Sequence, residues 1–454
     1  MSVTGMPGAD LEAREHCLSF GWKTSLLSEL VQVRYGKGVA AAQRLDSGVP
    51  YVASAGPMDF VADGLVEGPA IVVGRKGSVG NVQYFDGPVW PSDTTFYFDV
   101  PQELDGRFLS YQLQVAGLRK LDQSTAVPGL PRPALEAVVL HVAPLAEQKR
   151  IVAELERRLS HVDQAVRGLT RAQRQVMATR RSVLNATASG ALLHLDAVGW
   201  KAVTTGDVCG VRGGIQKQPK RMPKNNPHPF LRVANVGRGN LDLAEVHEVE
   251  LFGDELETYA LQAGDLLVVE GNGSVDQIGR AAIWDGSIAN CVHQNHLIRV
   301  RPGKAVDAHF LSLVWNAPVT VEQLRAVASS SSGLHTLSTG KIKSVRLHLP
   351  PLTDQVALVA EAQRRLSLLD AADRSISAGL SKAEQLRRSL LAAAFSGKLV
   401  PQDPNDEPAA VLLDKIRAER EEAAAAAKDA KAATKTTKKP AVRKTSVRKK
   451  ETQS

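Results

Sequence analysis

The sequence contains the same pattern twice. Residues 144–148 (PLAEQ) recur 207 positions later as residues 351–355 (PLTDQ), and residues 188–192 (ASGAL) recur at the same offset as residues 395–399 (FSGKL). A period of this length indicates a duplicated domain, because the units of solenoid proteins recur every ~20–50 residues. We therefore expect one polypeptide that presents two similar surfaces at a fixed separation.

The offset between the two copies changes along the chain before it becomes constant. Residues 21–23 (GWK) recur after 178 positions, residues 77–78 (GS) after 196, and residues 108–110 (FLS) after 202. Insertions have thus accumulated in the parts that precede the 207-residue offset. Surface loops tolerate such insertions, whereas a helical spacer that fixes a distance does not.

A heptad seam follows each copy of the first motif. Apolar residues recur at steps of three and four, and the seam repeats in the same register 207 residues later: Leu155, Leu159, Val162 and Leu169, then Leu366, Leu369, Ile376 and Leu380. This spacing predicts two long helices that pair as an antiparallel coiled coil, each roughly 70 Å long at 1.5 Å per residue. The alternative is two separate amphipathic helices, but the seam is longer than a small domain can cover.

These patterns predict a mixed α/β (α+β) fold with a pseudo-twofold internal repeat. Strands are expected at residues 70–73 and 265–269 and, as the last strands, at 138–142 and 345–349, with short helices near 108–118 and 310–316. The expected segments are an N-terminal extension (1–20), a first globular domain (21–144), a first helical spacer (145–193), a second globular domain (194–350), a second spacer (351–400), a C-terminal helical segment (401–427) and a basic disordered tail (428–454).

The net charge of +8 lies entirely in the tail. Residues 428–454 contain ten Lys and Arg against Asp429 and Glu451, which leaves the remainder of the chain neutral. The tail either attracts nucleic acid by neutralising phosphates or is a solubilising extension. The three cysteines are far apart, so we expect no disulfide framework and a reducing cytoplasm. We expect no secretory signal and no membrane helix.

Motifs that would carry catalysis fail on inspection. Residues 225–230 (NNPHPF) resemble a methyltransferase tetrad, but His228 interrupts the prolines, so we interpret the stretch as a proline-rich turn. The chain has no nucleotide-binding phosphate loop. Cys291, His293 and His296 have metal-binding side chains at loose spacing, and an interior strand is the better interpretation.

Two globular parts, each followed by a long helix that begins Pro-Leu-x-x-Gln, resemble the specificity subunit of a type I restriction–modification system. Residues 394–409 (AFSGKLVPQDPNDEPA) are similar to the usual end of that family's second helical region, and the resemblance covers residues 22–416. It implies a non-catalytic subunit with two target-recognition domains, each reading half of a bipartite double-stranded DNA sequence. The paired helices would dock two methyltransferase subunits and, through them, the restriction and translocase subunits. S-adenosylmethionine and ATP would bind those partners. The alternative is a duplicated coiled-coil scaffold for a partner other than DNA.

Candidate DNA contacts come from polar stretches at matching places in the two copies. In the second copy the stretch is too polar for a core element, which predicts a basic loop that contacts phosphates or guanine edges: Arg212, Lys217, Lys220, Arg221 and Lys224. The first copy has fewer candidates there: Arg34, Tyr35 and Lys37. Two glycine loops after strands supply the others: Arg75, Lys76 and Ser78, then Asn272 and Ser274. Polar loops at 330–335 and 124–129 are weaker candidates. Solvated loops and tight turns are the alternative for all of them.

Overall fold

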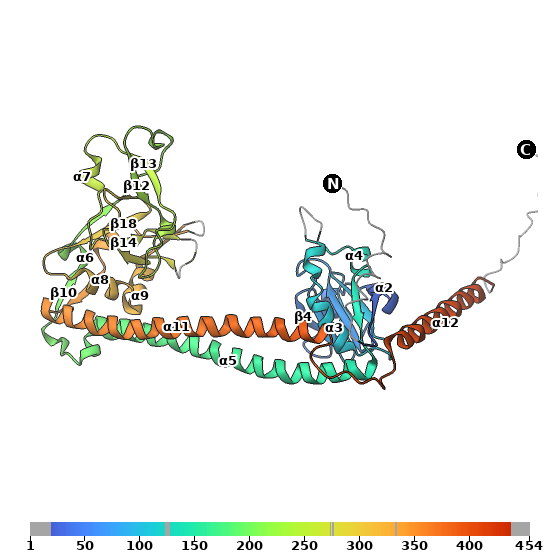
Figure 1. The fold of residues 1–454 in the computed structure, drawn as a ribbon. Coiled ribbons are helices and arrows are strands. Elements are labelled where there is room, and N and C mark those ends of the chain that lie inside the picture. Colours follow the sequence, from blue (N-terminus) through green and yellow to red (C-terminus); the bar gives the residue numbers. More distant parts are fainter. Residues whose placement is uncertain (1–19, 123–127, 273, 275–276, 332–333, 437–454) are drawn as a thin grey trace, which may run out of the picture. The chain divides into compact units, whose positions relative to one another are not determined.

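A computed structural model describes residues 20–122, 128–272, 274, 277–331 and 334–436 (Figure 1). The predicted N-terminal extension up to residue 19, the tail from residue 437, and parts of the loops predicted at 124–129 and 330–335 lie outside the described residues. The chain forms two compact units. Unit 1 comprises residues 1–166 and 381–454, and unit 2 comprises residues 167–380. Within the described part, we find no helix whose length and hydropathy would let it cross a membrane.

Unit 1 contains a small α+β domain. Its strands are β1 (Lys23–Leu26), β2 (Arg34–Tyr35), β3 (Val49–Ala53), β4 (Gly56–Val61), β5 (Ala70–Gly74), β6 (Val82–Phe85), β7 (Trp90–Pro91), β8 (Thr95–Asp99) and β9 (Val139–Val142). Its helices are α2 (Leu27–Leu30), α3 (Gly106–Val115) and α4 (Arg132–Glu136), with 3-10 turns at Ala41–Gln43 and Leu118–Leu121.

Strand β5 is the centre of this domain. It lies inside an antiparallel sheet of order β2-β8-β5-β6, and every residue of β5 is buried, which explains its continuous apolar sequence. Ile71 and Val73 face a cluster that includes Leu109 and Leu113 of α3. Val72 faces the other way, toward a second sheet of order β4-β3-β7. The core is therefore layered on both faces of β5.

Unit 2 repeats this order of elements. Its strands are β10 (Lys201–Thr204), β11 (Cys209–Gly213), β12 (Pro227–Leu231), β13 (His247–Glu250), β14 (Leu266–Val269), β15 (Gly271–Asn272), β16 (Ala281–Ile283), β17 (Val292–His293), β18 (Leu297–Pro302), β19 (Ser329–Ser331), β20 (Leu334–Thr336) and β21 (Arg346–Leu349). Its short helices are α6 (Thr205–Val208), α7 (Glu255–Tyr259), α8 (Ala308–Trp315), α9 (Pro318–Val327) and α10 (Thr339–Lys343), with 3-10 turns at Ala191–Leu193, Ala197–Gly199, Pro219–Arg221 and Val233–Asn235.

The sheets of unit 2 have the same topology as those of unit 1. The order β11-β18-β14-β16 matches β2-β8-β5-β6, the order β13-β12-β17 matches β4-β3-β7, and the ribbon β10-β21 matches β1-β9. Both three-stranded sheets contain one parallel pair, β3 with β7 and β12 with β17. The predicted duplication is therefore confirmed at the level of strand order. Unit 2 also contains a small sheet of order β15-β20-β19. At the corresponding place in unit 1, Lys76 forms an isolated antiparallel bridge with Gly129, and Lys76 precedes Asn272 of β15 by 196 residues.

One glycine in each unit allows the same close approach. A Cβ on Gly36 would lie 2.0 Å from the carbonyl oxygen of Ser92, and a Cβ on Gly214 would lie 2.2 Å from that of His293. These positions differ by 178 residues, the offset of the first motif. Only glycine lets the chain leaving β2 or β11 pass so close to the neighbouring backbone.

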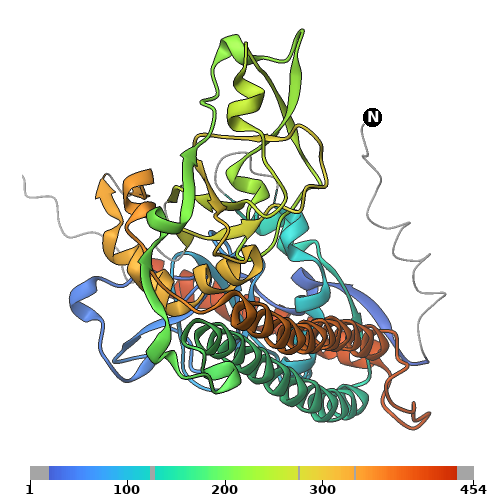
Figure 2. The same ribbon diagram turned by 90° about the vertical axis from the view of Figure 1, so that its left-hand side faces the viewer.

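Two long helices, α5 (Leu145–Ser189) and α11 (Leu352–Phe395), lie side by side (Figures 1 and 2). In unit 1, Leu155 near the start of α5 shares an apolar cluster with Leu390 near the end of α11. In unit 2, Val183 near the end of α5 shares a cluster with Leu358 near the start of α11. The predicted antiparallel coiled-coil pairing is confirmed in both units.

The predicted seam residues lie along this pair. The buried ones are Leu155, Leu159, Val162 and Ile376, and the partly buried ones are Leu169, Leu366, Leu369 and Leu380.

An ion pair crosses between the helices in each unit. Asp163 pairs with Arg387 in unit 1, and Arg180 pairs with Asp370 in unit 2. Shifting each residue of the first pair by 207 positions onto the other helix gives the second pair. The helix register is thus the same in both units.

A buried glutamine joins each long helix to the domain that precedes it. The Gln148 Oε1 atom accepts a hydrogen bond from the backbone N–H of Asp105 at 2.9 Å, and its Nε2 donates to the Ala143 carbonyl at 2.8 Å. The Gln355 Oε1 atom accepts from the backbone N–H of Asp307 at 2.8 Å. Because Asp105 and Asp307 are the N-cap residues of α3 and α8, the glutamine of the Pro-Leu-x-x-Gln motif holds two helix starts together.

Helix α12 (Ala409–Thr436) follows the long helices and packs on unit 1. Leu412 and Ile416 join the cluster that contains Leu27 and Leu30 of α2. The helix extends past residue 427, so the prediction of a disordered tail from residue 428 is wrong for residues 428–436. The alanines and lysines there are strong helix formers, which outweighs their low hydrophobicity.

Two segments predicted as loops are strands. Arg212 lies on β11, where it pairs with Arg299 of β18, because alternation along a sheet edge accommodates a polar side chain. Residues 227–231 form β12 and are not a turn. The Pro-containing half of β12 pairs with β13 alone, and β17 joins only at Phe230 and Leu231, so neither proline lies between two partner strands.

We predict that Gln355→Leu lowers the stability of the protein by about 1–3 kcal/mol, because it leaves the Asp307 N–H and the Pro350 carbonyl buried without their partner. Gln363→Leu, on an exposed position of the same helix, is the matched control. Urea unfolding followed by circular dichroism measures both. Equal urea midpoints for the two variants would contradict the role of Gln355 in attaching the long helix to the domain.

Candidate nucleic-acid interface

In unit 1, the predicted contacts Arg34, Tyr35 and Arg75 gather at the edge of the sheet. The Arg75 guanidinium carbon lies 5.3 Å from the centroid of the Tyr35 ring and 5.9 Å from that of Phe96. The Arg132 guanidinium carbon lies 6.0 Å from the Tyr35 ring. We call Tyr35, Arg75, Phe96 and Arg132 the arginine–tyrosine cluster. About half of the Tyr35 side chain is exposed, and the Arg75 and Arg132 side chains beside it are partly buried.

Hydrogen bonds and ion pairs orient this cluster. The Arg75 Nη2 atom donates to the Asp93 carbonyl at 2.7 Å. Arg132 pairs with Glu136 at 2.7 Å, and Arg34, which precedes Tyr35 on β2 and lies outside the cluster, pairs with Asp99 at 2.8 Å. Contacts of a guanidinium with an aromatic face restrict its orientation, so its remaining N–H groups are arranged before any ligand binds.

The other predicted contacts of unit 1 lie on the segments next to the cluster. The Lys37 and Lys76 side chains are exposed, and Ser78 is partly buried. The backbone N–H of Lys37 donates to the Pro91 carbonyl at 2.9 Å, and that of Lys76 to the Thr94 carbonyl at 3.1 Å. Both lysine backbones are therefore fixed, while their ammonium groups extend into solvent, where they can neutralise phosphates.

In unit 2, the basic stretch separates into exposed and internally bound side chains. Arg212, Lys217, Lys220 and Lys224 are exposed, although Arg212 Nη1 also donates to the Thr258 carbonyl at 3.4 Å. Arg221 is not exposed, because both of its Nη atoms donate to Glu255 at 2.7 Å. This pairing raises the pKa of Arg221 and lowers the pKa of Glu255. Arg221 thus joins the turn at Pro219–Arg221 to α7, whereas the lysines on either side remain accessible.

The backbone around Lys224 is fixed by a carboxylate. Glu250 accepts hydrogen bonds from the backbone N–H groups of Lys224, Asn225 and Asn226 at 2.8 to 3.1 Å. These bonds, with that of Lys224 the largest cause, lower the pKa of Glu250. The turn before β12 is therefore rigid at its base, and Lys224 projects from it.

The two units place different chemistry at equivalent positions. Gly213 occupies the position of Tyr35, and Gly271 on β15 occupies that of Arg75, at offsets of 178 and 196. Asn272 lies on β15, which pairs with β20, so a simple glycine loop is the wrong prediction there. Ser274 is exposed. The arginine–tyrosine cluster of unit 1 therefore has no sequence counterpart in unit 2, although the strands beneath it match.

Sequence reasoning missed Arg132 and Phe96. Arg132 follows Tyr35 by almost a hundred residues, so no local pattern connects them, and only the pairing of β2 with β8 brings Phe96 to Tyr35. In unit 2 it also missed the pair formed by His296 Nδ1 and Glu270 Oε2 at 3.2 Å.

The fold separates the three metal-capable residues Cys291, His293 and His296, for which an interior strand is the better interpretation. Cys291 and His293 are buried, whereas His296 is mostly exposed. Burial raises the pKa of the Cys291 thiol to about 12. Burial, with the nearby charge of Arg299, lowers the pKa of His293 to about 4. Among the described residues, no group of three or more His, Cys, Asp and Glu side chains is placed to hold a metal ion.

Comparison with known proteins identifies the family. A family model described as the type I restriction modification DNA specificity domain matches residues 20–165 and 197–378, once for each copy of the repeat. The chain belongs to this family.

Two curated type I specificity subunits are similar to this chain in sequence. The chain is 26% identical over 311 residues to the type I restriction enzyme EcoKI specificity subunit of Escherichia coli, which covers 63% of this chain and 65% of that protein. It is 28% identical over 307 residues to the StySPI specificity subunit of Salmonella potsdam, again covering 63% and 65%. Both matches span slightly less than two thirds of the relative.

A solved structure shares the fold of this type I specificity chain. A chain from the structure titled "Structural basis underlying complex assembly and conformational transition of the type I R-M system" matches with a TM-score of 0.65 and 18% identity, covering 84% of this chain and 99% of the other. At this identity the likeness concerns the fold.

We predict that buried, neutral His293 makes the protein less stable in acid. Its pKa is about 4 in the folded state against 6.5 when exposed, so the unfolded chain binds the proton first as the pH falls. Stability is therefore lost between pH 6.5 and 4, by about 3 kcal/mol at most. His293→Gln should flatten this part of the stability profile, and His296→Gln should not. Identical acid profiles for wild type and His293→Gln would contradict the assignment.

Proposed function

We propose that this chain is the DNA-recognition subunit of a type I restriction–modification complex. The supporting observation is the duplicated domain, in which identical strand order carries different exposed side chains at the same sheet edge. Each domain would read one half of a bipartite double-stranded target. The chain itself would be non-catalytic, since its relatives are named as specificity subunits.

In unit 1 the arginine–tyrosine cluster supports base recognition. Arginine offers paired N–H donors that fit the O6 and N7 acceptors of guanine in the major groove. Arg75 is already oriented by Tyr35 and by the Asp93 carbonyl. Lys37 and Lys76 beside it would contact phosphates and fix the register of the domain on DNA.

In unit 2 the exposed Arg212, Lys217, Lys220 and Lys224 would take both roles. Arg212 stands at the position of Arg34, 178 residues later. The glycines at the positions of Tyr35 and Arg75 leave no similar stack, so this domain would favour a different base sequence. Two domains with one skeleton and different donors are what a bipartite, asymmetric target requires.

The helices α5 and α11 would set the spacing between the half-sites and dock two methyltransferase subunits. Their common register supports a rigid spacer, since half-sites on B-DNA must match in axial distance and rotational phase. S-adenosylmethionine and ATP would bind the methyltransferase and the restriction or translocase subunits, respectively. A coiled-coil scaffold for another partner is the competing function.

We predict that the chain with its methyltransferase subunits selects a bipartite motif from random duplex DNA, with two short half-sites at one fixed spacing. Affinity should fall steeply with salt, as expected when phosphates are neutralised. Methylome sequencing of the host, with and without the gene, should give the same motif. Binding without any enriched motif would favour the scaffold function instead.

We predict that Arg75→Ala and Arg212→Ala each relax base preference in one half-site only, and in opposite halves. A lost base contact costs about 1–3 kcal/mol of discrimination. Selection from libraries randomised in one half at a time measures both variants, and each serves as the control for the other. Loss of preference in both halves with either variant would argue against independent reading.

A further inference from the structure

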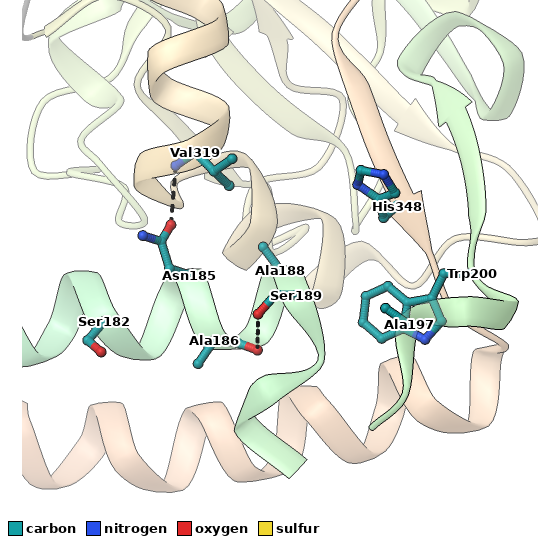
Figure 3. A pocket seen from close by; sticks show the side chains of 9 residues that line it. All are labelled: Ser182, Asn185, Ala186, Ala188, Ser189, Ala197, Trp200, Val319 and His348. Carbon is teal, nitrogen blue, oxygen red and sulfur yellow. Dashed lines mark hydrogen bonds between the residues drawn. The ribbon is translucent and has the colours of Figure 1, made fainter. Parts of the chain in front are cut away.

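Unit 2 contains a cavity beside the last turns of α5. Its volume is about 550 Å³, and its walls include Asn185 and Ala188 of α5, Trp200, Val319 of α9 and His348 of β21 (Figure 3). Ala188 points into the space between Val319 on one side and Trp200 with His348 on the other (Figure 3). A space of this size accommodates one or two large side chains.

The repeat supplies an internal template for this cavity. Phe395 stands 207 positions after Ala188, and Trp22 and His141 correspond to Trp200 and His348. In unit 1 the Phe395 ring is buried, with its centroid 5.4 Å from that of Phe108. Trp22 packs against Phe108 at 6.2 Å in turn. The counterpart of the cavity is therefore filled by a phenylalanine of the chain itself.

The histidine of unit 1 indicates how the backbone of such a phenylalanine is held. The His141 Nδ1 atom lies 3.1 Å from the Phe395 carbonyl oxygen. In unit 2, His348 is exposed at the cavity wall. The His348 imidazole is therefore a polar group at the cavity wall that a partner could contact when it places an aromatic ring beside Trp200.

The polar groups of the cavity wall are partly engaged already. Asn185 Oδ1 accepts from the backbone N–H of Val319 at 3.2 Å, and Ser189 Oγ donates to the Ala186 carbonyl at 3.4 Å (Figure 3). No Lys or Arg lines the cavity, so it is unsuited to phosphate. What it offers is apolar surface, an indole ring and one imidazole.

We propose that this cavity receives one aromatic side chain from a methyltransferase subunit. The proposal rests on the proposed function, in which the helical spacer docks that partner, and α5 forms one wall of the cavity. An aromatic ring in a preformed pocket is the usual anchor of a protein–protein interface. The equivalent place in unit 1 is closed by Phe395, so the two halves of the spacer differ in this respect.

Filling the cavity tests the proposal. Ala188→Phe introduces the residue that unit 1 already has, and it should weaken binding of the methyltransferase subunit to the full chain at least tenfold in a sedimentation or calorimetric titration. Val198→Phe is the control. Val198 is 90% exposed, so this substitution adds the same ring outside the cavity. Unchanged affinity for a folded Ala188→Phe chain would overturn the proposal.

A second experiment, which measures protection of a cysteine at the cavity from thiol labelling, tests the proposal if Ala188→Phe does not fold. In a Cys17→Ser background, Ser189→Cys places a thiol at the cavity, while Cys209 and Cys291 are buried with pKa values raised by burial to about 11 and 12. Methyltransferase subunits should slow thiol labelling at position 189 at least tenfold and leave Met222→Cys, an exposed control site, unaffected. Binding without protection would overturn the pocket alone. Absence of binding by the unaltered chain would overturn the proposed function as well.

Discussion

The register between α5 and α11 constrains the rest of this protein. One residue inserted into either helix would turn everything after it by about 100° and break the seam. The ion pair Asp163–Arg387 in unit 1 and the ion pair Arg180–Asp370 in unit 2 show the same register in each unit. Surface ion pairs of this kind add little stability, so their importance lies in specifying one alignment. This explains why the 207-residue offset is constant here and drifts elsewhere.

Each domain is attached to its long helix by the buried glutamine of the Pro-Leu-x-x-Gln motif. Gln148 and Gln355 are fully buried and bond the N-cap residues of α3 and α8, so the long helices and the short domain helices start from a common hydrogen-bonded point. Glu154 and Glu361 are a second equivalent pair, each six residues after the buried glutamine of its helix. Each accepts hydrogen bonds from two arginines, which lower both pKa values to about 2. The skeleton of each copy is therefore fixed by the same local bonds.

This skeleton could be predicted from the sequence, because residues that are buried at regular intervals along a helix are apolar at the same intervals in the sequence. The seam of the helices and the buried runs of β5 and β14 follow from the apolar spacing alone. The candidate site was harder to predict from the sequence, since an edge strand and a loop have similar polar compositions. Arg212 lies on β11 and not on a loop. Arg221 is bound internally by Glu255 and is not free at the surface. Arg132 joins Tyr35 only through tertiary packing. The prolines of β12 suggested a turn, because proline is not tolerated between two partner strands. In the structure the second partner, β17, pairs with β12 only at Phe230 and Leu231, after both prolines.

Symmetry in the skeleton also reveals where the copies were free to differ. Leu27 and Leu30 share a cluster with residues of α12 in unit 1. Their counterparts in unit 2 are Thr205, which is buried and donates a hydrogen bond to the Val345 carbonyl, and Val208, which is partly buried. Phe395 fills a space that Ala188 leaves open, and Tyr35 with Arg75 is replaced by two glycines. None of these differences changes the order or register of a strand. The two copies therefore differ in side chains, some of them buried, while they keep one strand skeleton, which is why a comparison of the copies shows where their packing and their surfaces diverge.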